Sequence, residues 1–365
     1  MGRLKYYSLK NILAKNCDYN LIIGERSNGK TYACLKYGLE QYVNSGYVKQ
    51  FAYIRRWKED VTGRRADAVF TSIVQNNEVF KLTDGKYSDI RYYSGKYYLC
   101  NYDEESKKFI AMKEPFCYNF SLSDMEHDKS TSYPNIDNII FDEFITRKYY
   151  LNDEFVLFMN VVSTIVRDRN INKIFLCGNT VNKYNPYFEN FGIKNEIEQG
   201  RIDCYKFGES GETTLALEYC ADNAESKKKS NKYFAFNNPK LQMITGGKWE
   251  LDIYPHLQAD QRIKESDIVF SFVVVFDGKM FQGDVIENGE ESFIYFHNKT
   301  TPIKPKTLVY QLQYSTSPYV RNNLMYVNDK ITRKIVSYFA SGKVFYQSNE
   351  IGESIHNFVV NCQKH

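Results

Sequence analysis

The chain has 365 residues, with 48 Lys and Arg against 44 Asp and Glu, so its formal net charge is only +4. Hydrophobic residues (43%) and charged residues (25%) occur at ordinary globular levels, which argues against a disordered chain, a collagen-like repeat and a coiled coil. The length suits two domains, no apolar run reaches the roughly 18 residues of a membrane helix, and the small charge surplus does not by itself indicate nucleic-acid binding.

From residue 19 to about residue 208, short apolar runs alternate with helical stretches, which is typical of a parallel-sheet α/β domain. Between residues 78 and 111 the pattern changes to alternating residues with turn signals, which predicts a β-hairpin insertion. The expected strands are 20–23, 50–54, 139–141 and 173–177, and the expected helices are 30–43 and 152–166.

After residue 208 a stretch rich in Gly, Glu, Ser and Lys, with the run 227–229 of three lysines, predicts a solvated linker over 208–250. The chain then predicts a smaller α+β domain over 251–365. Its expected strands are 268–276, 280–286 and 292–297, joined by tight turns as a meander, and its expected helices are 328–340, followed by Gly342, and 350–361.

Two residue types stand out in the composition. The aromatic fraction is 16%, with 31 tyrosines, and we assign most of them to cores and subunit contacts before base stacking. None of the eight cysteines forms a C-x-x-C pair or lies near a His at metal-ligand spacing, which argues against a zinc site.

No basic-then-apolar leader is seen at the start, so we expect reduced thiols in a cytosol.

The segment from Gly24 to Thr31 fits the phosphate-loop pattern G-x-x-x-x-G-K-[ST] at every required position. An apolar strand enters it and a helix leaves it, so backbone N–H groups and the helix N-terminus would face the β-phosphate. Lys30 is placed to neutralise the β- and γ-phosphates, and Thr31 offers its hydroxyl to Mg²⁺. The alternative reading is a chance glycine turn, which the strand and helix on either side disfavour.

An apolar strand over 138–141 ends in two adjacent carboxylates, Asp142 and Glu143. Asp142 would complete the Mg²⁺ shell with Thr31, and Glu143 could polarise an attacking water. The alternative is an acidic strand end that is simply exposed to solvent. Paired with the upstream phosphate loop, the two carboxylates favour an NTPase that uses a glutamate to activate water.

Three further polar residues follow predicted elements. Asn179 comes after the strand 173–177, where an amide can sense the γ-phosphate, although a Gly-Asn pair also forms ordinary turns. Arg167 and Arg169 come after the helix 152–166. They could cap that helix, or one of them could reach the nucleotide of a neighbouring subunit, where such an arginine contributes about 10³ to 10⁵ in rate.

Basic residues cluster just beyond the second strand, with Trp57 among them, and suit either a phosphate backbone or a neighbour's nucleotide. Glu59 and Asp60 dilute this cluster, so an ion-paired surface is an equal alternative. Lys129 lies in a polar loop before the strand of Asp142, where a lone lysine is usually solvated. The members of the cluster are Arg55, Arg56, Lys58, Arg64 and Arg65.

These motifs occur in one order along the chain, and that order and spacing resemble the DNA-packaging ATPase (DNA encapsidation protein) family of phi-29-type podoviruses. The resemblance is dense from residue 1 to about residue 207 and thinner beyond. It rests on the segments 22–30, 53–58, 129–135, 140–145, 167–169 and 185–188.

The resemblance implies an α/β fold in which a P-loop NTPase domain of the additional-strand, catalytic-glutamate class covers 1–207. It also implies that 251–365 is a smaller α+β, RNase H-like domain, a vestigial nuclease that binds nucleic acid or docks. The first strand of that domain carries no acidic residue, so we expect it not to cleave DNA.

Carried onto this chain, the resemblance assigns roles to residues. Glu143 activates water, Asn179 senses the nucleotide, and Arg167 acts in trans, with Arg169 as a second candidate. Arg56, Lys58 and Lys129 match basic positions that face DNA or the neighbouring subunit. Thr31 and Asp142 hold Mg²⁺, and the residues that bind ATP are Gly24, Glu25, Arg26, Ser27, Asn28, Gly29, Lys30, Thr31 and Asp142.

The implied function is an ATP-driven motor that pumps double-stranded viral DNA into a preformed prohead. Its partners would be the DNA, the prohead portal, copies of itself in a ring that is pentameric by resemblance, and a scaffold packaging RNA. It would work in the host cytoplasm, docked transiently on the prohead. The alternatives are a helicase-like or other DNA translocase that needs no capsid, and a nuclease-competent terminase.

Overall fold

The computed structural model describes residues 6–127, 131–146, 148–167, 169–193, 197–221, 254–257, 263–289, 291–325 and 329–363. The chain forms two compact units, each described here by itself. The first unit comprises residues 1–147 and 155–250, and the second comprises 148–154 and 251–365. No helix among the described residues has both the length and the apolar character that crossing a membrane requires.

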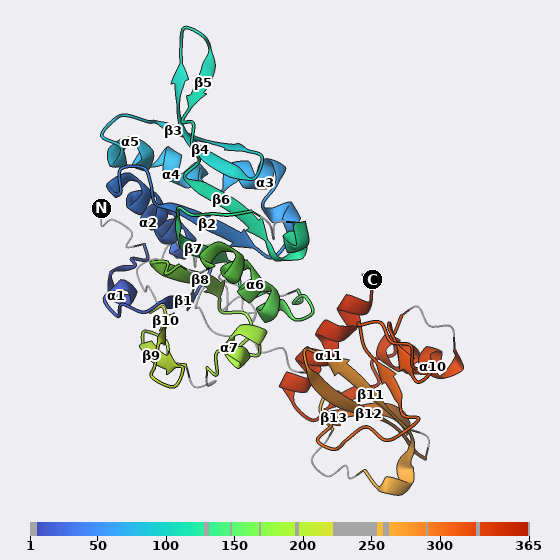
Figure 1. Cartoon of the computed structure of the whole chain (residues 1–365). Coiled ribbons are helices and arrows are strands. Elements are labelled where there is room, and N and C mark those ends of the chain that lie inside the picture. The colour runs from blue at the N-terminus through green and yellow to red at the C-terminus, as the bar shows by residue number, and fades with distance from the viewer. Residues whose placement is uncertain are drawn as a thin grey trace, which may run out of the picture. The chain divides into compact units, whose positions relative to one another are not determined.

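The centre of the first unit is a run of parallel strands in the order β6-β2-β7-β8-β1-β10 (Figure 1). Most of these strands are buried along nearly their whole length, as expected for parallel strands covered on both faces. This confirms the four strands predicted before residue 180. The bounds are β1 Tyr19–Gly24, β2 Gln50–Arg55, β6 Cys117–Ser121, β7 Ile136–Asp142, β8 Lys173–Asn179 and β10 Thr213–Tyr219.

β10 lies inside the segment predicted as a linker from residue 208, and it pairs in parallel with β1. That part of the prediction is wrong, because a short strand next to a Gly- and Glu-containing turn gave little apolar signal in the sequence. The remaining part, 222–250, lies outside the described residues, as does the lysine run 227–229.

Antiparallel strands extend the sheet at both edges, with β9 Ile202–Phe207 beside β10 and the insertion at the other edge. The insertion consists of β3 Asp89–Tyr93, β4 Lys96–Asp103 and β5 Lys108–Ala111, with the β4–β5 hairpin projecting from the body of the sheet (Figure 1). A hairpin insertion is therefore confirmed, but it begins at residue 89. Residues 78–82, predicted as part of it, form helix α5 instead.

Helices cover both faces of this sheet. On one face α2 and the small helices that follow β2 share a core with Phe51, Ile140 and Phe175, and on the other face α6 and α7 pack on Phe141. The bounds are α1 Lys10–Leu13, α2 Lys30–Asn44, α3 Gly63–Ala68, α4 Thr71–Gln75, α5 Glu78–Leu82, α6 Glu154–Val166 and α7 Pro186–Asn190, with 3₁₀ turns Lys58–Asp60 and Leu122–His127.

Many tyrosines are core residues, as the sequence predicted. Tyr42, Tyr97 and Tyr187 are among the largest fully buried side chains of the first unit, and Tyr150 and Tyr310 play the same part in the second. Their rings meet other aromatic rings edge-on, for example Tyr97 against Phe70 at a centroid distance of 4.7 Å. The aromatic surplus is thus explained in part by packing.

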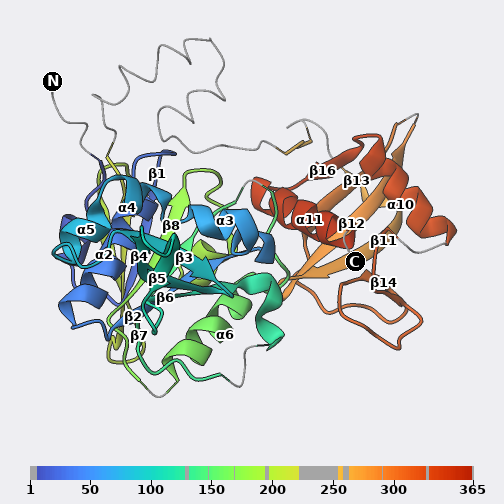
Figure 2. The ribbon, with the colours of Figure 1, turned by 90° about the horizontal axis from the view of Figure 1, so that it is seen from above.

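The second unit has its own sheet in the order β15-β14-β11-β12-β13-β16, with α10 and α11 packed on one face (Figure 2). The predicted three-stranded meander is confirmed as β11–β12–β13, and both predicted helices form. The bounds are β11 Ile268–Phe276, β12 Lys279–Asn288, β13 Glu291–Asn298, β14 Leu308–Tyr310, β15 Val320–Arg321, β16 Val344–Tyr346, α10 Lys330–Ala340 and α11 Asn349–Cys362, with a 3₁₀ turn Glu265–Asp267.

A segment from the middle of the chain belongs to this second unit. The backbone N–H of Tyr150 donates to Asn357 Oδ1 at 3.0 Å, and the Asn361 side-chain amide donates to the Tyr150 carbonyl at 3.0 Å. The N–H of Asp153 donates to Asp277 Oδ1 at 2.8 Å. The chain therefore leaves the first unit five residues after Glu143 and returns to it within α6.

A buried carboxylate stands on β12 of the second sheet, next to the strand that the sequence showed to be free of acids. Asp284 accepts hydrogen bonds from Ser271 at 2.6 Å and Gln282 at 2.8 Å, and His297 Nε2 lies 2.9 Å from its second oxygen. Burial works against ionisation, but the bonds from His297, Ser271 and Gln282 hold the pKa of Asp284 below its ordinary value. All of its oxygens are thus used inside the sheet.

The pairing of His297 with Asp284 predicts a pH dependence of stability. The hydrogen bond to Asp284 raises the pKa of His297 in the folded chain above the unfolded value near 6.5. The folded state therefore binds more protons above pH 6.5, so the free energy of unfolding should fall as pH rises through the folded pKa, by at most about 1.36 kcal/mol per pH unit. Thermal unfolding of wild type and His297→Gln between pH 6 and 9 checks this. A wild-type slope no steeper than that of His297→Gln would contradict it.

A buried amide beneath α2 predicts a stabilising substitution. Asn138 on β7 is fully buried, and neither its Nδ2 nor its Oδ1 has a hydrogen-bond partner. An unpaired buried polar group costs about 1 to 3 kcal/mol, so Asn138→Val should raise the free energy of unfolding by about that amount. Chemical denaturation measures the change, and Asn361→Val, which loses two buried hydrogen bonds, should shift it the other way. An Asn138→Val protein less stable than wild type would show that the amide is satisfied.

Candidate nucleotide-hydrolysis site

The phosphate loop joins β1 to α2 through backbone angles that few side chains adopt. Gly29 has φ +94° and is the residue before the helix, and Ser27 has φ +63°. A Cβ on Gly24 would lie 2.9 Å from the Cβ of Cys220, so only glycine fits there without movement. The loop predicted from the sequence therefore has the expected strand-loop-helix setting, with the N-terminus of a 15-residue helix behind it.

Lys30 lies beneath this loop and is 4% exposed. Its Nζ donates to the Glu25 carbonyl at 2.7 Å, to the Gly24 carbonyl at 3.2 Å and to Asn28 Oδ1 at 3.1 Å. Burial lowers the pKa of Lys30 from its ordinary value, and nearby polar and acidic groups oppose that shift. The ammonium is thus held within the loop, by the carbonyls of Gly24 and Glu25 and the side chain of Asn28.

Asp142, the last residue of β7, faces the first turn of α2. Thr31 Oγ1 donates to Asp142 Oδ1 at 2.7 Å, and the buried Tyr53 hydroxyl donates to Asp142 Oδ2 at 3.1 Å. β8 lies between the phosphate-loop strand and the strand of Asp142. A hydroxyl and a carboxylate oxygen that face each other are the donor set Mg²⁺ prefers, so these two predicted residues fit a magnesium ion.

Glu143 follows directly and has φ +58°, an uncommon angle that directs it away from the strand. Its Oε2 lies 2.6 Å from Arg55 Nη2, and the same guanidinium reaches Asp142 Oδ2 at 3.4 Å. Burial works against the charge of Arg55, but Tyr53, Asp142 and Glu143 raise the pKa of Arg55 above its ordinary value. Arg55 thus contacts the carboxylates of the site, whereas the sequence placed it in a basic cluster suited to a phosphate backbone, a neighbour's nucleotide or an ion-paired surface.

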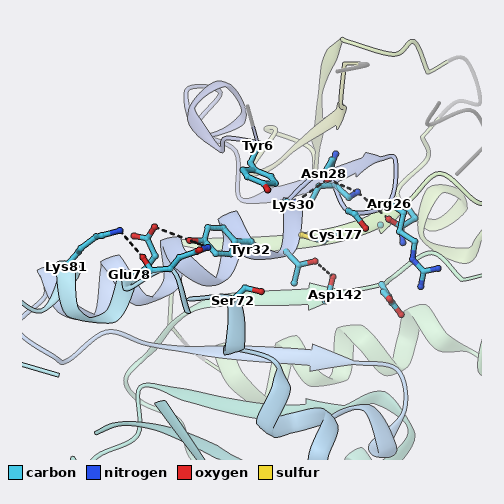
Figure 3. A pocket seen from close by; sticks show the side chains of 17 residues that line it. Tyr6, Arg26, Asn28, Lys30, Tyr32, Ser72, Glu78, Lys81, Asp142 and Cys177 are labelled. Atoms are coloured by element: carbon cyan, nitrogen blue, oxygen red, sulfur yellow. Dashed lines mark hydrogen bonds between the residues drawn. The ribbon is translucent and has the colours of Figure 1, made fainter. Parts of the chain in front are cut away.

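Asn179 closes the site from β8. Its Oδ1 accepts from Lys30 Nζ at 3.4 Å, so it reaches the same point as the loop lysine. Asn179, Lys30, Thr31, Asp142 and Glu143 line one pocket of about 830 Å³ (Figure 3). The predicted residues that line it are Arg26, Ser27, Asn28, Gly29, Lys30, Thr31, Asp142, Glu143 and Asn179.

The two arginines after α6 differ in their surroundings. Arg169 donates to four backbone carbonyls, those of Tyr133, Pro134, Ile136 and Ile165. Arg167 is exposed, has φ +48° and donates from Nη2 to the Thr131 carbonyl at 2.8 Å. Arg169 therefore holds the backbone before and at the start of β7 by its hydrogen bonds, whereas Arg167 lies at the surface.

The three basic residues predicted to face DNA or the neighbouring subunit also differ in their surroundings. Arg56 is 4% exposed and donates to the carbonyls of Glu143 at 3.1 Å and Phe144 at 2.7 Å, so it holds the backbone at Glu143 and Phe144. Lys58 is at the surface, and its Nζ lies 2.6 Å from Asp124 Oδ2. Lys129 lies outside the described residues.

A strand-loop-helix with a buried lysine, a Thr–Asp pair and an adjacent glutamate defines a nucleoside-triphosphate-hydrolysing enzyme, here an ATPase. The family model of the Podovirus DNA encapsidation protein (Gp16) matches residues 1–363. The chain belongs to that family, and it is a phage DNA packaging motor ATPase.

Individual relatives agree with the family. The chain is 24% identical over 365 residues to the DNA packaging protein of Bacillus phage PZA and 22% identical over 363 residues to that of Bacillus phage phi29, each time covering 96% of both chains. A chain of the bacteriophage Phi-29 viral genome packaging motor assembly has a similar fold, with a TM-score of 0.57 at 21% identity, covering 98% of both chains.

Proposed function

We propose that this chain works as a ring motor of the additional-strand, catalytic-glutamate class, which couples ATP hydrolysis to the movement of double-stranded viral DNA into a preformed prohead. The observation that carries the hydrolytic part is the Thr31–Asp142 hydrogen bond of 2.7 Å with Glu143 next in the chain. It brings two sequence motifs 111 residues apart to one point.

In the proposed site, the loop amides and the Lys30 ammonium bind the β- and γ-phosphates and offset their negative charge. Thr31 and Asp142 would hold Mg²⁺, which when bound neutralises charge on the phosphates. Lys30 already contacts Asn179, so the amide of Asn179 lies next to the place where a γ-phosphate would be bound or lost.

Glu143 is the proposed general base. Its carboxylate accepts a proton from the water that attacks the γ-phosphate, and the water oxygen then forms the new bond to phosphorus while the bond to the leaving oxygen breaks. Arg55 holds and orients this carboxylate, since Arg55 Nη2 lies only 2.6 Å from Glu143 Oε2.

Contacts with other molecules follow from the family and from the exposed groups. Arg167 is proposed to reach the nucleotide of a neighbouring subunit, in a homomeric ring that is pentameric by family resemblance. Lys58 and Lys129 remain proposed contacts to DNA or to the neighbouring subunit, whereas the burial of Arg56 supports an internal role. The second unit is proposed to be an RNase H-like docking or nucleic-acid-binding domain. The proposed partners are the prohead portal and a packaging RNA, in the host cytoplasm.

The proposed function is tested by measuring ATP hydrolysis with and without purified proheads and linear genomic DNA, alongside protection of the DNA from DNase. We expect hydrolysis to rise when both are present, and DNase-resistant DNA to accumulate. Lys30→Ala, which removes the buried ammonium, should abolish both signals. DNA-stimulated hydrolysis that never protects DNA, with matched proheads, would instead favour a translocase that needs no capsid.

A further inference from the structure

One arm of the pocket is not used by the phosphate-binding machinery. It opens beyond Thr31, at the first turn of α2, and Figure 3 shows Tyr6 on one side of it and Tyr32 with Glu78 and Lys81 on the other. The residues that line this arm come from the N-terminal segment, α2, α4 and α5, and are Tyr6, Tyr32, Ser72, Asn76, Glu78 and Lys81.

The direction in which a bound triphosphate would run indicates which part of the nucleotide this arm would hold. This step rests on the proposed function. The γ-phosphate end is fixed by Glu143 and by Asn179, both on the side of β7 and β8. The phosphate chain then follows the loop toward the N-terminus of α2, where backbone N–H groups of the first turn would bind it. The group attached to the α-phosphate must therefore leave the loop beside Tyr32, which is where the arm opens.

We propose that this arm is the nucleoside subsite and that the ring of Tyr6 stacks on the base. The Cβ and Cδ1 of Tyr6 lie 3.4 and 3.5 Å from the position that a Cβ on Gly29 would take, so the side chain lies directly against the phosphate loop. Tyr6 is nevertheless 67% exposed. An aromatic ring held at a pocket wall with its face uncovered suits a flat, apolar base face.

Two bonds of the next residue hold Tyr6 in place. The backbone N–H of Tyr7 donates to the Asn28 carbonyl at 2.9 Å, and the Tyr7 hydroxyl donates to Glu218 Oε2 on β10 at 2.6 Å. Burial raises the pKa of both Tyr7 and Glu218 above their ordinary values, so the Tyr7 hydroxyl keeps its proton and donates it in this hydrogen bond. Tyr7 and Glu218 are thus positioning residues for Tyr6.

The opposite wall is a polar network that is already ordered. Tyr32 donates from its hydroxyl to Glu78 Oε1 at 3.0 Å, and Lys36 Nζ lies 2.9 Å from Glu78 Oε2. Asn76 donates to the Tyr32 hydroxyl at 3.3 Å and Lys81 donates to the Asn76 carbonyl at 2.8 Å. A polar wall across from an aromatic one is the arrangement expected for a sugar edge and a base face.

The test compares ATPγS with inorganic tripolyphosphate, which has the phosphates but no nucleoside, by isothermal titration calorimetry on the full chain. Tyr6→Ala should weaken ATPγS binding by about 5-fold to 100-fold and leave tripolyphosphate binding unchanged, while Tyr6→Phe, which keeps the ring, should bind both as wild type does. Glu218→Ala should weaken ATPγS binding alone, to a smaller extent. Tyr93→Ala, an exposed tyrosine of β3 outside the pocket, is the matched control and should change neither.

Tyr6→Ala that binds ATPγS as tightly as wild type would overturn the proposal. Equal weakening of both ligands would overturn it too, because the effect would then come from a disturbed phosphate loop. If the wild type binds neither ligand, while its fold is intact by circular dichroism, the proposed nucleotide site itself fails and the subsite fails with it.

Discussion

Replacing Glu143 with Gln should leave ATP binding near the wild-type level and lower steady-state ATP hydrolysis by about 10² to 10⁴ fold. The amide is nearly isosteric and leaves the phosphate loop, Lys30 and the Thr31–Asp142 pair unchanged, but it cannot accept the proton of the attacking water. Binding of a fluorescent ATP analogue and release of phosphate measure the two quantities separately.

A matched control is available in the same ion-pair network. Asp60 also contacts Arg55, at 3.5 Å between Oδ2 and Nη2, but it does not line the pocket. Asp60→Asn therefore removes one carboxylate from the same arginine and should keep hydrolysis within a few fold of wild type. Steady-state hydrolysis of Glu143→Gln equal to that of wild type would remove Glu143 from its assigned role.

The core of this site was predictable because its signals are local in the chain. A run of apolar residues such as 20–23 can be buried on both faces only as an interior strand, and the loop that follows must carry Gly24 and Gly29 to turn back on itself. Two carboxylates at the end of a second such strand must come out at the same edge of the sheet, because the strands are parallel. Only these rules were needed to bring Thr31 and Asp142 together.

The place of Arg55 was not predictable from the same rules. Ile54 pairs with Phe141 in the register of β2 and β7, and this sets Arg55 beside Asp142 at the strand ends. Strand order and register are properties of the whole sheet. The local sequence around Arg55, which is rich in other basic residues, therefore did not indicate which carboxylates Arg55 would contact. Arg56, one residue later, is a buried donor to the carbonyls of Glu143 and Phe144.

The segment 148–154 is a second feature that the sequence did not predict, because it belongs to the second unit. The backbone N–H and carbonyl of Tyr150 bond to the side chains of Asn357 and Asn361, more than 200 positions away. No local pattern marks a polar loop whose hydrogen bonds will be completed by a distant helix, and both asparagines lie on a helix that the sequence predicted only by its bounds, 350–361. The division of the chain into two units is therefore less simple than one boundary in a lysine-rich stretch.

The second large effect is expected for Arg167. Removing a trans-acting arginine lowers hydrolysis by about 10³ to 10⁵ fold, so Arg167→Ala alone should be nearly inactive, like Glu143→Gln alone. Each of the two variants retains the residue that is replaced in the other. In a mixed ring, an Arg167→Ala subunit still has Glu143, and a neighbouring Glu143→Gln subunit can supply Arg167 to it.

Mixing the two inactive variants should therefore restore part of the wild-type rate of phosphate release, with a maximum at an intermediate ratio. Arg169→Ala distinguishes this from a structural defect, because loss of four bonds to backbone carbonyls should lower the free energy of unfolding within each subunit. A neighbour cannot replace those bonds, so adding Glu143→Gln subunits should not rescue Arg169→Ala. Absence of recovery at every ratio of Arg167→Ala to Glu143→Gln, in preparations that form rings, would show that Arg167 acts within its own chain or not at all.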